Sequence, residues 1–214
     1  MTGKLVVSSS ELILGGQKSG KSRRAELLAG QWLGQSPTHR AVLIATAQPW
    51  DEEMRVRIQR HQSDRAARVP GLVTVEEPLQ LAAALQRHSQ PQTLVLVDCL
   101  TLWLTNWLMP PSHPKSDAAG GAGLGESRDG RLFEEKMPVS PDWQAQSAHF
   151  FEAIKNAPGP VVLVGNEIGL GVIPLGPEVR AFVDALGVLN QQAAQACTRV
   201  TLMVAGLPMT VKPA

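Results

Sequence analysis

Residues 11–33 read ELILGGQKSGKSRRAELLAGQWL, and this stretch decides the fold. Leu12–Leu14 is a short apolar run typical of a buried strand, whereas Ser22–Leu33 repeats apolar residues at helical spacing. The residues between them match G-x-x-x-x-G-K-[ST] in full. A glycine-rich loop between a strand and a helix surrounds an anion with backbone N–H groups and the positive end of the helix dipole. The stretch therefore predicts a loop that binds a polyphosphate.

Within this loop, two residues carry specific chemistry. The ammonium group of Lys21 would neutralise β- and γ-phosphate oxygens, and the hydroxyl of Ser22 would bind Mg²⁺. The glycines allow positive φ angles and close approach of the backbone to the ligand. The residues predicted to bind the nucleotide are Gly15, Gly16, Gln17, Lys18, Ser19, Gly20, Lys21 and Ser22.

The rest of the chain alternates apolar runs with amphipathic stretches. This alternation predicts an α/β fold, a mostly parallel sheet with flanking helices, in the P-loop NTPase (RecA-like) architecture. The expected strands are Leu12–Leu14, Ala41–Ala45, Val73–Val75, Leu94–Val97, Val161–Val164 and Val200–Val204, with Met209–Lys212 as an edge strand. The expected helices are Ser22–Leu33, Asp51–Gln62, Leu79–Arg87, Pro141–Asn156 and Pro177–Ala196. We expect a single nucleotide-binding domain over residues 1–214, with a long loop insertion at about 110–140 that is rich in Gly, Pro and Ser.

Composition argues against several classes of protein. The 214 residues carry 20 Lys and Arg against 19 Asp and Glu, no Tyr and 4% aromatic residues, so no nucleic-acid partner is expected. The two cysteines, Cys99 and Cys197, do not make a disulfide scaffold. No apolar stretch is long enough to predict a transmembrane segment, and the N-terminal residues lack a signal-peptide pattern. We expect a cytoplasmic protein.

A carboxylate follows a second apolar strand. The run Thr93–Val97 ends in Asp98, which is the form of a Walker-B element whose acid holds Mg²⁺ directly or through water. An acid at the end of a strand is weak evidence alone, but here it accompanies a complete phosphate loop. Ser22 and Asp98 are therefore the candidate metal ligands.

The helix predicted from Asp51 contains a histidine that allows two interpretations. Met54, Ile58 and His61 are spaced so that they share one face, which would hold His61 on the apolar side, flanked by Arg57 and Arg60. The spacing alone favours a core or capping histidine, and a nucleophile or acid–base group is the alternative. The Asn-Lys-x-Asp signature is absent, which argues against a conventional G-protein switch.

Together, several segments resemble the bifunctional adenosylcobinamide kinase / adenosylcobinamide-phosphate guanylyltransferase family of cobalamin biosynthesis. They occur in family order and cover most of the chain outside the first ten residues and residues 110–140. The matching segments are LILGGQKSGKSRRAE, VLIATAQPWDEEMRVRIQRH, VLVDCLTLWLTN, VLVGNEIGLGVIP and VAGLPMTVK. The phosphate loop alone would name no family, but the combination is specific.

The resemblance implies two reactions. ATP or GTP would phosphorylate adenosylcobinamide; GTP would then guanylylate His61, and the GMP would pass to adenosylcobinamide phosphate to give adenosylcobinamide-GDP. It implies that His61 is catalytic, beside Lys21 of the phosphate loop, and that the segment after the second strand helps to bind the guanine nucleotide, to which Asp98 of the Walker-B element is added. It also implies a homo-oligomer, a trimer in the family. The further nucleotide-binding residues implied are Thr46, Ala47, Gln48 and Glu76.

Two positions depart from the family pattern. Relatives often carry Arg where this chain has Val183 and Val188, so its grip on substrate or its assembly would differ if those arginines contact phosphate or a neighbouring subunit. Two alternatives therefore stand beside the bifunctional enzyme: a single-activity small-molecule kinase and a non-catalytic GTP-binding regulator. Sequence does not choose between ATP and GTP for the kinase step, and no short motif marks the residues that contact the corrinoid.

Overall fold

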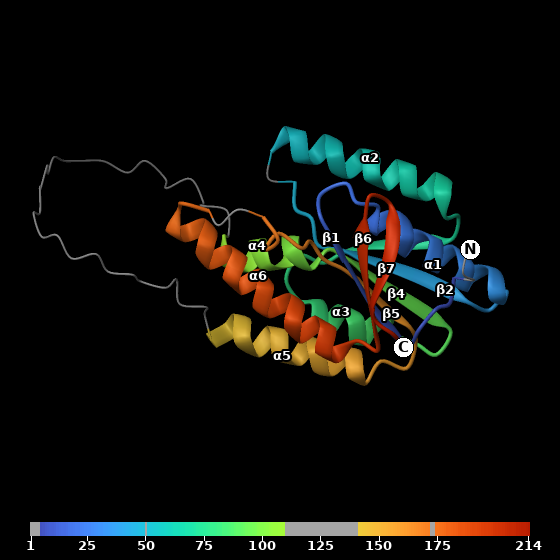
Figure 1. Cartoon of the computed structure of the whole chain (residues 1–214). Coiled ribbons are helices and arrows are strands. Elements are labelled where there is room, and N and C mark those ends of the chain that lie inside the picture. Colours follow the sequence, from blue (N-terminus) through green and yellow to red (C-terminus); the bar gives the residue numbers. More distant parts are fainter. Residues whose placement is uncertain (1–4, 50, 110–140, 172–173) are drawn as a thin grey trace, which may run out of the picture.

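The computed structural model describes residues 5–49, 51–109, 141–171 and 174–214, and its centre is a seven-stranded sheet in the order β3-β2-β4-β5-β1-β6-β7. The first six strands are parallel, and β7 pairs with β6 in the antiparallel direction (Figure 1). The strands are β1 Ser10–Gly15, β2 Arg40–Ala45, β3 Leu72–Glu76, β4 Thr93–Asp98, β5 Val161–Val164, β6 Arg199–Val204 and β7 Leu207–Lys212. The predicted α/β fold with a mostly parallel sheet is confirmed.

Helices cover both faces of this sheet. Helices α1 (Lys21–Gln35) and α2 (Glu52–Arg68) lie on one face (Figure 1). The other face is covered by α3 Leu81–His88, α4 Leu100–Leu108, α5 Pro141–Lys155 and α6 Pro177–Ala196. Each face has its own hydrophobic core, one built with α1 and the other with α3 to α6.

The strands are uninterrupted runs of apolar residues because successive side chains enter opposite cores. In β1, Leu12 packs into the core on the side of α3 to α6, and Ile13 packs into the core beneath α1. Val95 and Leu96 of β4 divide in the same way. A strand buried on both faces needs an apolar residue at every position rather than at every second one. This is the physical basis of the sequence pattern from which the strands were predicted.

Two elements differ from the prediction. Helix α2 continues to Arg68, six residues beyond the predicted end at Gln62. The prediction ended too early because the last turns of α2 are polar and carry no apolar periodicity. Helix α4 was not predicted, since residues 100–108 are apolar nearly all round and lack an amphipathic signature. Residues 110–140, where the insertion was expected, lie outside the described residues, so the single-domain organisation stays a prediction. Among the described helices, none is long and apolar enough to span a membrane.

Candidate nucleotide site

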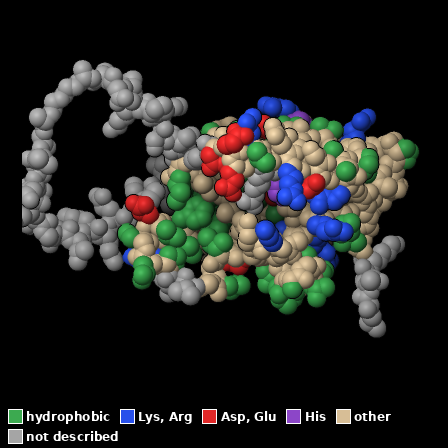
Figure 2. All heavy atoms as spheres, turned by 90° about the horizontal axis from the view of Figure 1, so that it is seen from above, with side chains coloured by type: hydrophobic (Ala, Val, Ile, Leu, Met, Phe, Trp, Pro, Cys, Tyr) green, Lys and Arg blue, Asp and Glu red, His purple; other side chains and the backbone are tan. Residues whose placement is uncertain are grey.

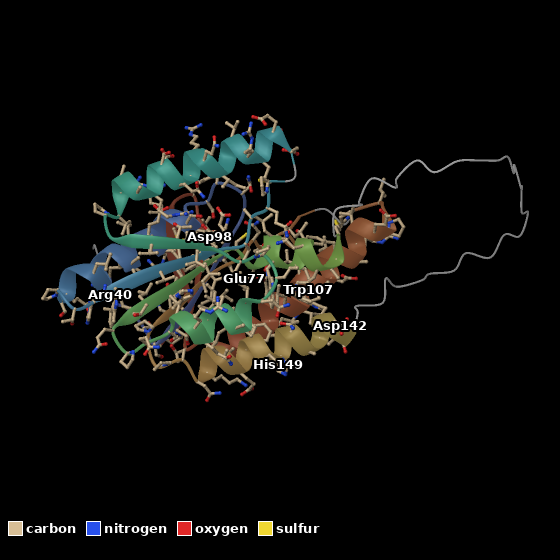
Figure 3. All side chains as sticks on the ribbon, turned by 180° about the vertical axis from the view of Figure 1, so that it is seen from behind. Arg40, Glu77, Asp98, Trp107, Asp142 and His149 are labelled. Carbon is tan, nitrogen blue, oxygen red and sulfur yellow. The ribbon has the colours of Figure 1, made fainter. Side chains whose placement is uncertain are left out.

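The parallel strands bring the predicted site residues to one edge of the sheet. The phosphate loop follows β1, Thr46 follows β2, and Asp98 is the last residue of β4. Figure 3 shows Asp98 and Glu77 at this edge, with Arg40, the first residue of β2, at the opposite edge. Ligands of open parallel sheets bind beyond the carboxyl ends of the strands. The arrangement therefore gathers the phosphate loop and the Walker-B acid where a nucleotide would bind.

The phosphate loop has a compact conformation. Lys18 and Gly20 have positive φ angles of 55° and 97°, and Lys21 begins helix α1. The Nζ of Lys21 donates a hydrogen bond of 2.6 Å to the carbonyl oxygen of Gly16. The hydroxyl of Ser19 is buried and has no hydrogen-bond partner among the described residues. A buried, unpaired hydroxyl inside such a loop fits a ligand that brings its own oxygens, as a phosphate does.

The first residue of the loop requires glycine. Gly15 has a φ of 153°, and a Cβ at this position would lie 2.6 Å from the carbonyl oxygen of Met203 and 2.6 Å from the Ser19 Oγ. The carbonyl oxygen of Gly15 accepts a hydrogen bond of 3.1 Å from the backbone N–H of Glu167. Strand β6 and the segment after β5 therefore hold the loop from two sides, and no larger side chain fits between them.

A buried ion pair fixes helix α1 behind the loop. Arg24 forms an ion pair of 2.9 Å with Glu11 of β1, whose side chain is 1% exposed. Thr201 of β6 donates a hydrogen bond of 2.7 Å to the same carboxylate, and Arg199 lies 3.9 Å from it. A buried carboxylate is tolerated only when it is paired and hydrogen-bonded. The network anchors the first turns of α1, and with them the phosphate loop, to strands β1 and β6.

Lys21 and Asp98 interact electrostatically in this site. Burial lowers the pKa of Lys21 below its ordinary value of 10.5, and the neighbouring Cys99 and Asp98 oppose that shift. Burial, together with Asp98, raises the pKa of Cys99 to about 12, so its thiol stays protonated. Asp98 and the half-buried Ser22 offer two hard oxygen ligands. Mg²⁺ commonly takes few protein ligands besides phosphate oxygens and water, so this donor set fits that ion.

Thr46 lies at the site, and its side-chain hydroxyl is hydrogen-bonded to the backbone of Cys99. Its Oγ1 donates to the Cys99 carbonyl oxygen at 2.8 Å and accepts from the Cys99 N–H at 2.9 Å. Asn106 of α4 is also buried, and its amide donates to the carbonyl oxygens of Thr46 at 2.8 Å and Pro78 at 3.0 Å. These bonds tie the end of β2 to the segments after β3 and β4. The side chain of Thr46 thus has a structural role, and its contact with nucleotide stays a prediction.

The side chains of the two adjacent glutamates at the end of β3, Glu76 and Glu77, have different partners. Glu77 accepts hydrogen bonds from the backbone N–H groups of Leu79 and Gln80 at 3.0 and 2.8 Å, so its side chain stabilises the turn that begins α3. Glu76 is exposed and accepts a hydrogen bond of 3.1 Å from Gln62 of α2. Glu76 is therefore the member of the pair that lies toward α2, and its contact with nucleotide stays a prediction. Ala47 and Gln48 are half-buried after β2.

Helix α2 begins after Asp51 as predicted, but His61 is more exposed than predicted. Asp51 caps the helix by accepting a hydrogen bond of 2.6 Å from the N–H of Met54. Met54 and Ile58 are half-buried, whereas His61 is exposed. The prediction that an apolar face shelters His61 is wrong, because the face defined by Met54 and Ile58 is only half-buried and leaves His61 exposed. Arg60 is paired with Asp64 at 4.0 Å.

Two features of the site were not recognised from sequence. Asn190 of α6 is buried and donates to the carbonyl oxygen of Asn166 at 3.0 Å and to the Glu167 carboxylate at 3.4 Å. The other residue that was not recognised is Asn106, whose amide bonds the carbonyl oxygens of Thr46 and Pro78. Asn106 lies within a mostly apolar helical stretch, and that contrast was an available signal; Asn190 is followed by Gln191 and Gln192, so no such contrast marks it. The Glu167 carboxylate also accepts from the N–H of Gly169 at 2.9 Å.

Comparison with known proteins identifies the family to which this geometry belongs. Residues 11–211 match the family model described as cobinamide kinase / cobinamide phosphate guanyltransferase, CobU. The chain belongs to the CobU family. The bifunctional adenosylcobalamin biosynthesis protein CobP of Pseudomonas aeruginosa is 42% identical over 202 residues, which span 94% of this chain and 96% of that protein. The bifunctional adenosylcobalamin biosynthesis proteins CobU of Escherichia coli and Salmonella typhimurium are 33% and 34% identical, each over 94% of this chain and 98% of its own length.

The CobU-family match spans every structural element of the site. It includes the phosphate loop, Asp98, the whole of α2 and the loop after β5. A cavity of about 380 Å³, lined among others by Ser89, His149 and Pro158, lies between α3 and α5. It contains none of the predicted site residues and lies near the amino ends of β4 and β5, opposite the phosphate loop.

Proposed function

We propose that this CobU-family chain phosphorylates adenosylcobinamide with ATP or GTP and then transfers GMP from GTP to adenosylcobinamide phosphate. The observation that carries the proposal is the buried Lys21, folded over the phosphate loop and interacting electrostatically with Asp98. That pair is suited to a nucleoside triphosphate with its Mg²⁺. The family relationship supplies the identity of the second substrate.

The first reaction is a phosphoryl transfer. The hydroxyl of the aminopropanol group attacks the γ-phosphorus, an oxygen–phosphorus bond forms, and the bond from the γ-phosphorus to the β,γ-bridging oxygen breaks to release the nucleoside diphosphate. The hydroxyl proton passes to solvent water as the new bond forms. Loop N–H groups, the unpaired Ser19 hydroxyl and Lys21 stabilise the phosphate oxygens, and Ser22 and Asp98 would hold Mg²⁺ there. When bound, Mg²⁺ supplies charge neutralisation on the β- and γ-phosphates.

The second reaction proceeds in two displacements. A neutral imidazole nitrogen of His61 attacks the α-phosphorus of GTP, and the bond to the α,β-bridging oxygen breaks to release pyrophosphate. A phosphate oxygen of adenosylcobinamide phosphate then attacks the same phosphorus, and the nitrogen–phosphorus bond breaks to give adenosylcobinamide-GDP. Nucleophilic catalysis replaces one difficult transfer with two easier ones. His61 lies on an exposed part of α2.

Binding of the guanine nucleotide is assigned to Thr46, Ala47, Gln48 and Glu76 as part of the same proposal. Glu76 accepts from Gln62, the residue that directly follows His61, so the two candidates belong to neighbouring parts of the molecule. A trimeric assembly belongs to the proposal as well, and a cytoplasmic location stays a prediction. Val188, where relatives often carry Arg, is 53% exposed on α6 and is thus available to a neighbouring subunit.

A pyrophosphate-release assay with GTP and adenosylcobinamide phosphate tests the function. The bifunctional enzyme releases one pyrophosphate for each adenosylcobinamide-GDP formed. A single-activity kinase would instead transfer the γ-phosphate to adenosylcobinamide and release no pyrophosphate, and a regulator would bind GTP without turnover. Either of those results would replace the proposal.

A further inference from the structure

A buried carboxylate of α1 fastens helix α2 to the body of the protein. The side chain of Glu26 is 5% exposed and lies 3.0 Å from the Nε of Arg68 and 3.8 Å from the Nε of Arg65. The Arg65 side chain is itself 10% exposed, whereas that of Arg68 is 40% exposed. These three residues, which we call the α1–α2 clamp, join the buried Arg65 of α2 to the buried Glu26 of α1.

Apolar packing does little to hold α2. Among its side chains that the structure describes, Arg65 alone is buried, and Val56 is 55% exposed. The face on which α2 lies carries Lys and Arg as well as Asp and Glu side chains (Figure 2). A helix that is polar all round depends on specific polar contacts for its position. Besides the clamp, an exposed hydrogen bond from Gln62 to Glu76 joins α2 to the end of β3.

The clamp determines the position of His61, on α2, relative to the neighbouring helix α1. Helices α1 and α2 each connect two parallel strands, so both run from the carboxyl edge of the sheet toward its amino edge. Going back four residues from Glu26 leads to Ser22, and going back four residues from Arg65 leads to His61. Each step of four residues is about 6 Å along a helix axis. With Glu26 and Arg65 side by side, His61 comes level with the start of α1, where the phosphate loop ends.

The histidine also shares the face that carries the clamp. His61 and Arg65 are four residues apart and Arg68 is three further on, so their side chains lie along one side of α2. That side is directed toward α1, because Arg65 and Arg68 contact Glu26 there. From this helical spacing we infer that His61, one turn nearer the carboxyl edge of the sheet, lies on the side of α2 that faces the region of the phosphate loop.

We propose that Glu26 is a positioning residue for guanylyl transfer: its ion pairs with Arg65 and Arg68 hold α2 at the height that aligns His61 with the phosphate loop. The inference rests on the proposed function and deepens it. Glu26 touches neither nucleotide nor corrinoid in this account and acts through α2. It serves the histidine step alone, since the γ-phosphoryl transfer uses the loop, Lys21 and Asp98 without α2.

The test compares the two reactions in the same preparations. Wild type, Glu26→Gln and Arg68→Gln are given GTP labelled at the α-phosphate, and the rate of covalent labelling is measured; γ-phosphate transfer to adenosylcobinamide is measured in parallel. Misplacement of a reacting group by about 1 Å costs on the order of a hundredfold in rate, so we expect labelling in Glu26→Gln to fall by roughly that factor while kinase activity persists. Arg68→Lys, which keeps the charge, should retain more labelling than Arg68→Gln.

Arg55→Gln is the matched control. Arg55 pairs with Glu52 on the exposed side of the same helix at 2.5 Å, and its loss should leave both rates unchanged. Labelling of Glu26→Gln and Arg68→Gln at the wild-type rate would overturn the positioning role alone. Equal loss of both reactions would show a merely structural role and also overturn it. If Glu26→Gln does not fold, the partly exposed Arg68 variants decide the question. A wild type that takes no label at all would instead overturn the proposed function, and this inference with it.

Discussion

The Nζ of Lys21 lies 2.6 Å from the carbonyl oxygen of Gly16, so the lysine folds back over the loop that precedes it. This hydrogen bond holds a buried ammonium group at the mouth of the phosphate loop. Burial lowers the pKa of Lys21, while Asp98 is among the groups that oppose the shift. A triphosphate in the loop would bring several negative charges to the same ammonium group.

Binding of GTP should therefore take up protons at alkaline pH. The pKa of Lys21 in the free protein is below 10.5, and bound phosphates favour the charged form and raise it again. Between the free and bound pKa values, the complex holds more protons than the separate partners, and GTP affinity falls as pH rises through that window. Calorimetric titrations in two buffers of different ionisation enthalpy measure this uptake. Lys21→Arg, whose side chain stays charged, should abolish it; uptake that persists in this variant would assign it to another group.

The two glutamates at the end of β3, Glu76 and Glu77, should respond differently to substitution. Glu77→Ala removes the acceptor for two backbone N–H groups at the start of α3, and we expect it to lower the free energy of unfolding by about 1 kcal/mol with little change in GTP affinity. Glu76→Ala should weaken GTP binding several-fold and leave the unfolding transition near that of wild type. Thermal unfolding and GTP titration of both variants measure the two effects, and the reverse pattern would show that Glu77 is the ligand.

Asn106 should be important for stability although it is not a predicted ligand. Asn106→Leu leaves the carbonyl oxygens of Thr46 and Pro78 without their buried donor, and we expect a loss of roughly 2–4 kcal/mol in the free energy of unfolding. Chemical denaturation measures this loss. Asn156→Ala is the control, because the Asn156 amide donates to the exposed backbone carbonyl oxygen of Glu152 on α5. This substitution should change the free energy of unfolding by no more than about 0.5 kcal/mol. Equal effects of the two substitutions would contradict the structural role of Asn106.

Local sequence patterns were enough to place the phosphate loop between β1 and α1, and Asp98 at the end of β4; their contacts with nucleotide stay predictions. Each depends on a few consecutive residues, such as the apolar run before Gly15, whose alternate side chains enter two cores. The contacts of Thr46 with Cys99 and of Glu26 with Arg65 join residues far apart in sequence. No spacing rule predicts such pairs, because the order of the strands decides which ends become neighbours.

The exposure of His61 was predicted wrongly for a related reason. Its spacing from Met54 and Ile58 defines one helix face correctly, but spacing does not tell how deeply that face is buried. The depth depends on what α2 packs against, and the clamp at Arg65 holds the helix through charged rather than apolar contacts. The same long-range contact that sequence could not predict is the one proposed to align His61.

Covalent labelling of the protein by GTP tests the central claim most directly. Wild type is incubated with GTP labelled at the α-phosphate, and we expect acid-labile label on the protein with release of one pyrophosphate for each label bound. His61→Ala should bind GTP and take no label, whereas His149→Ala, a substitution on α5 beside the distant cavity, should be labelled as wild type is. Label that persists in His61→Ala would show that another residue carries the GMP and would contradict the account.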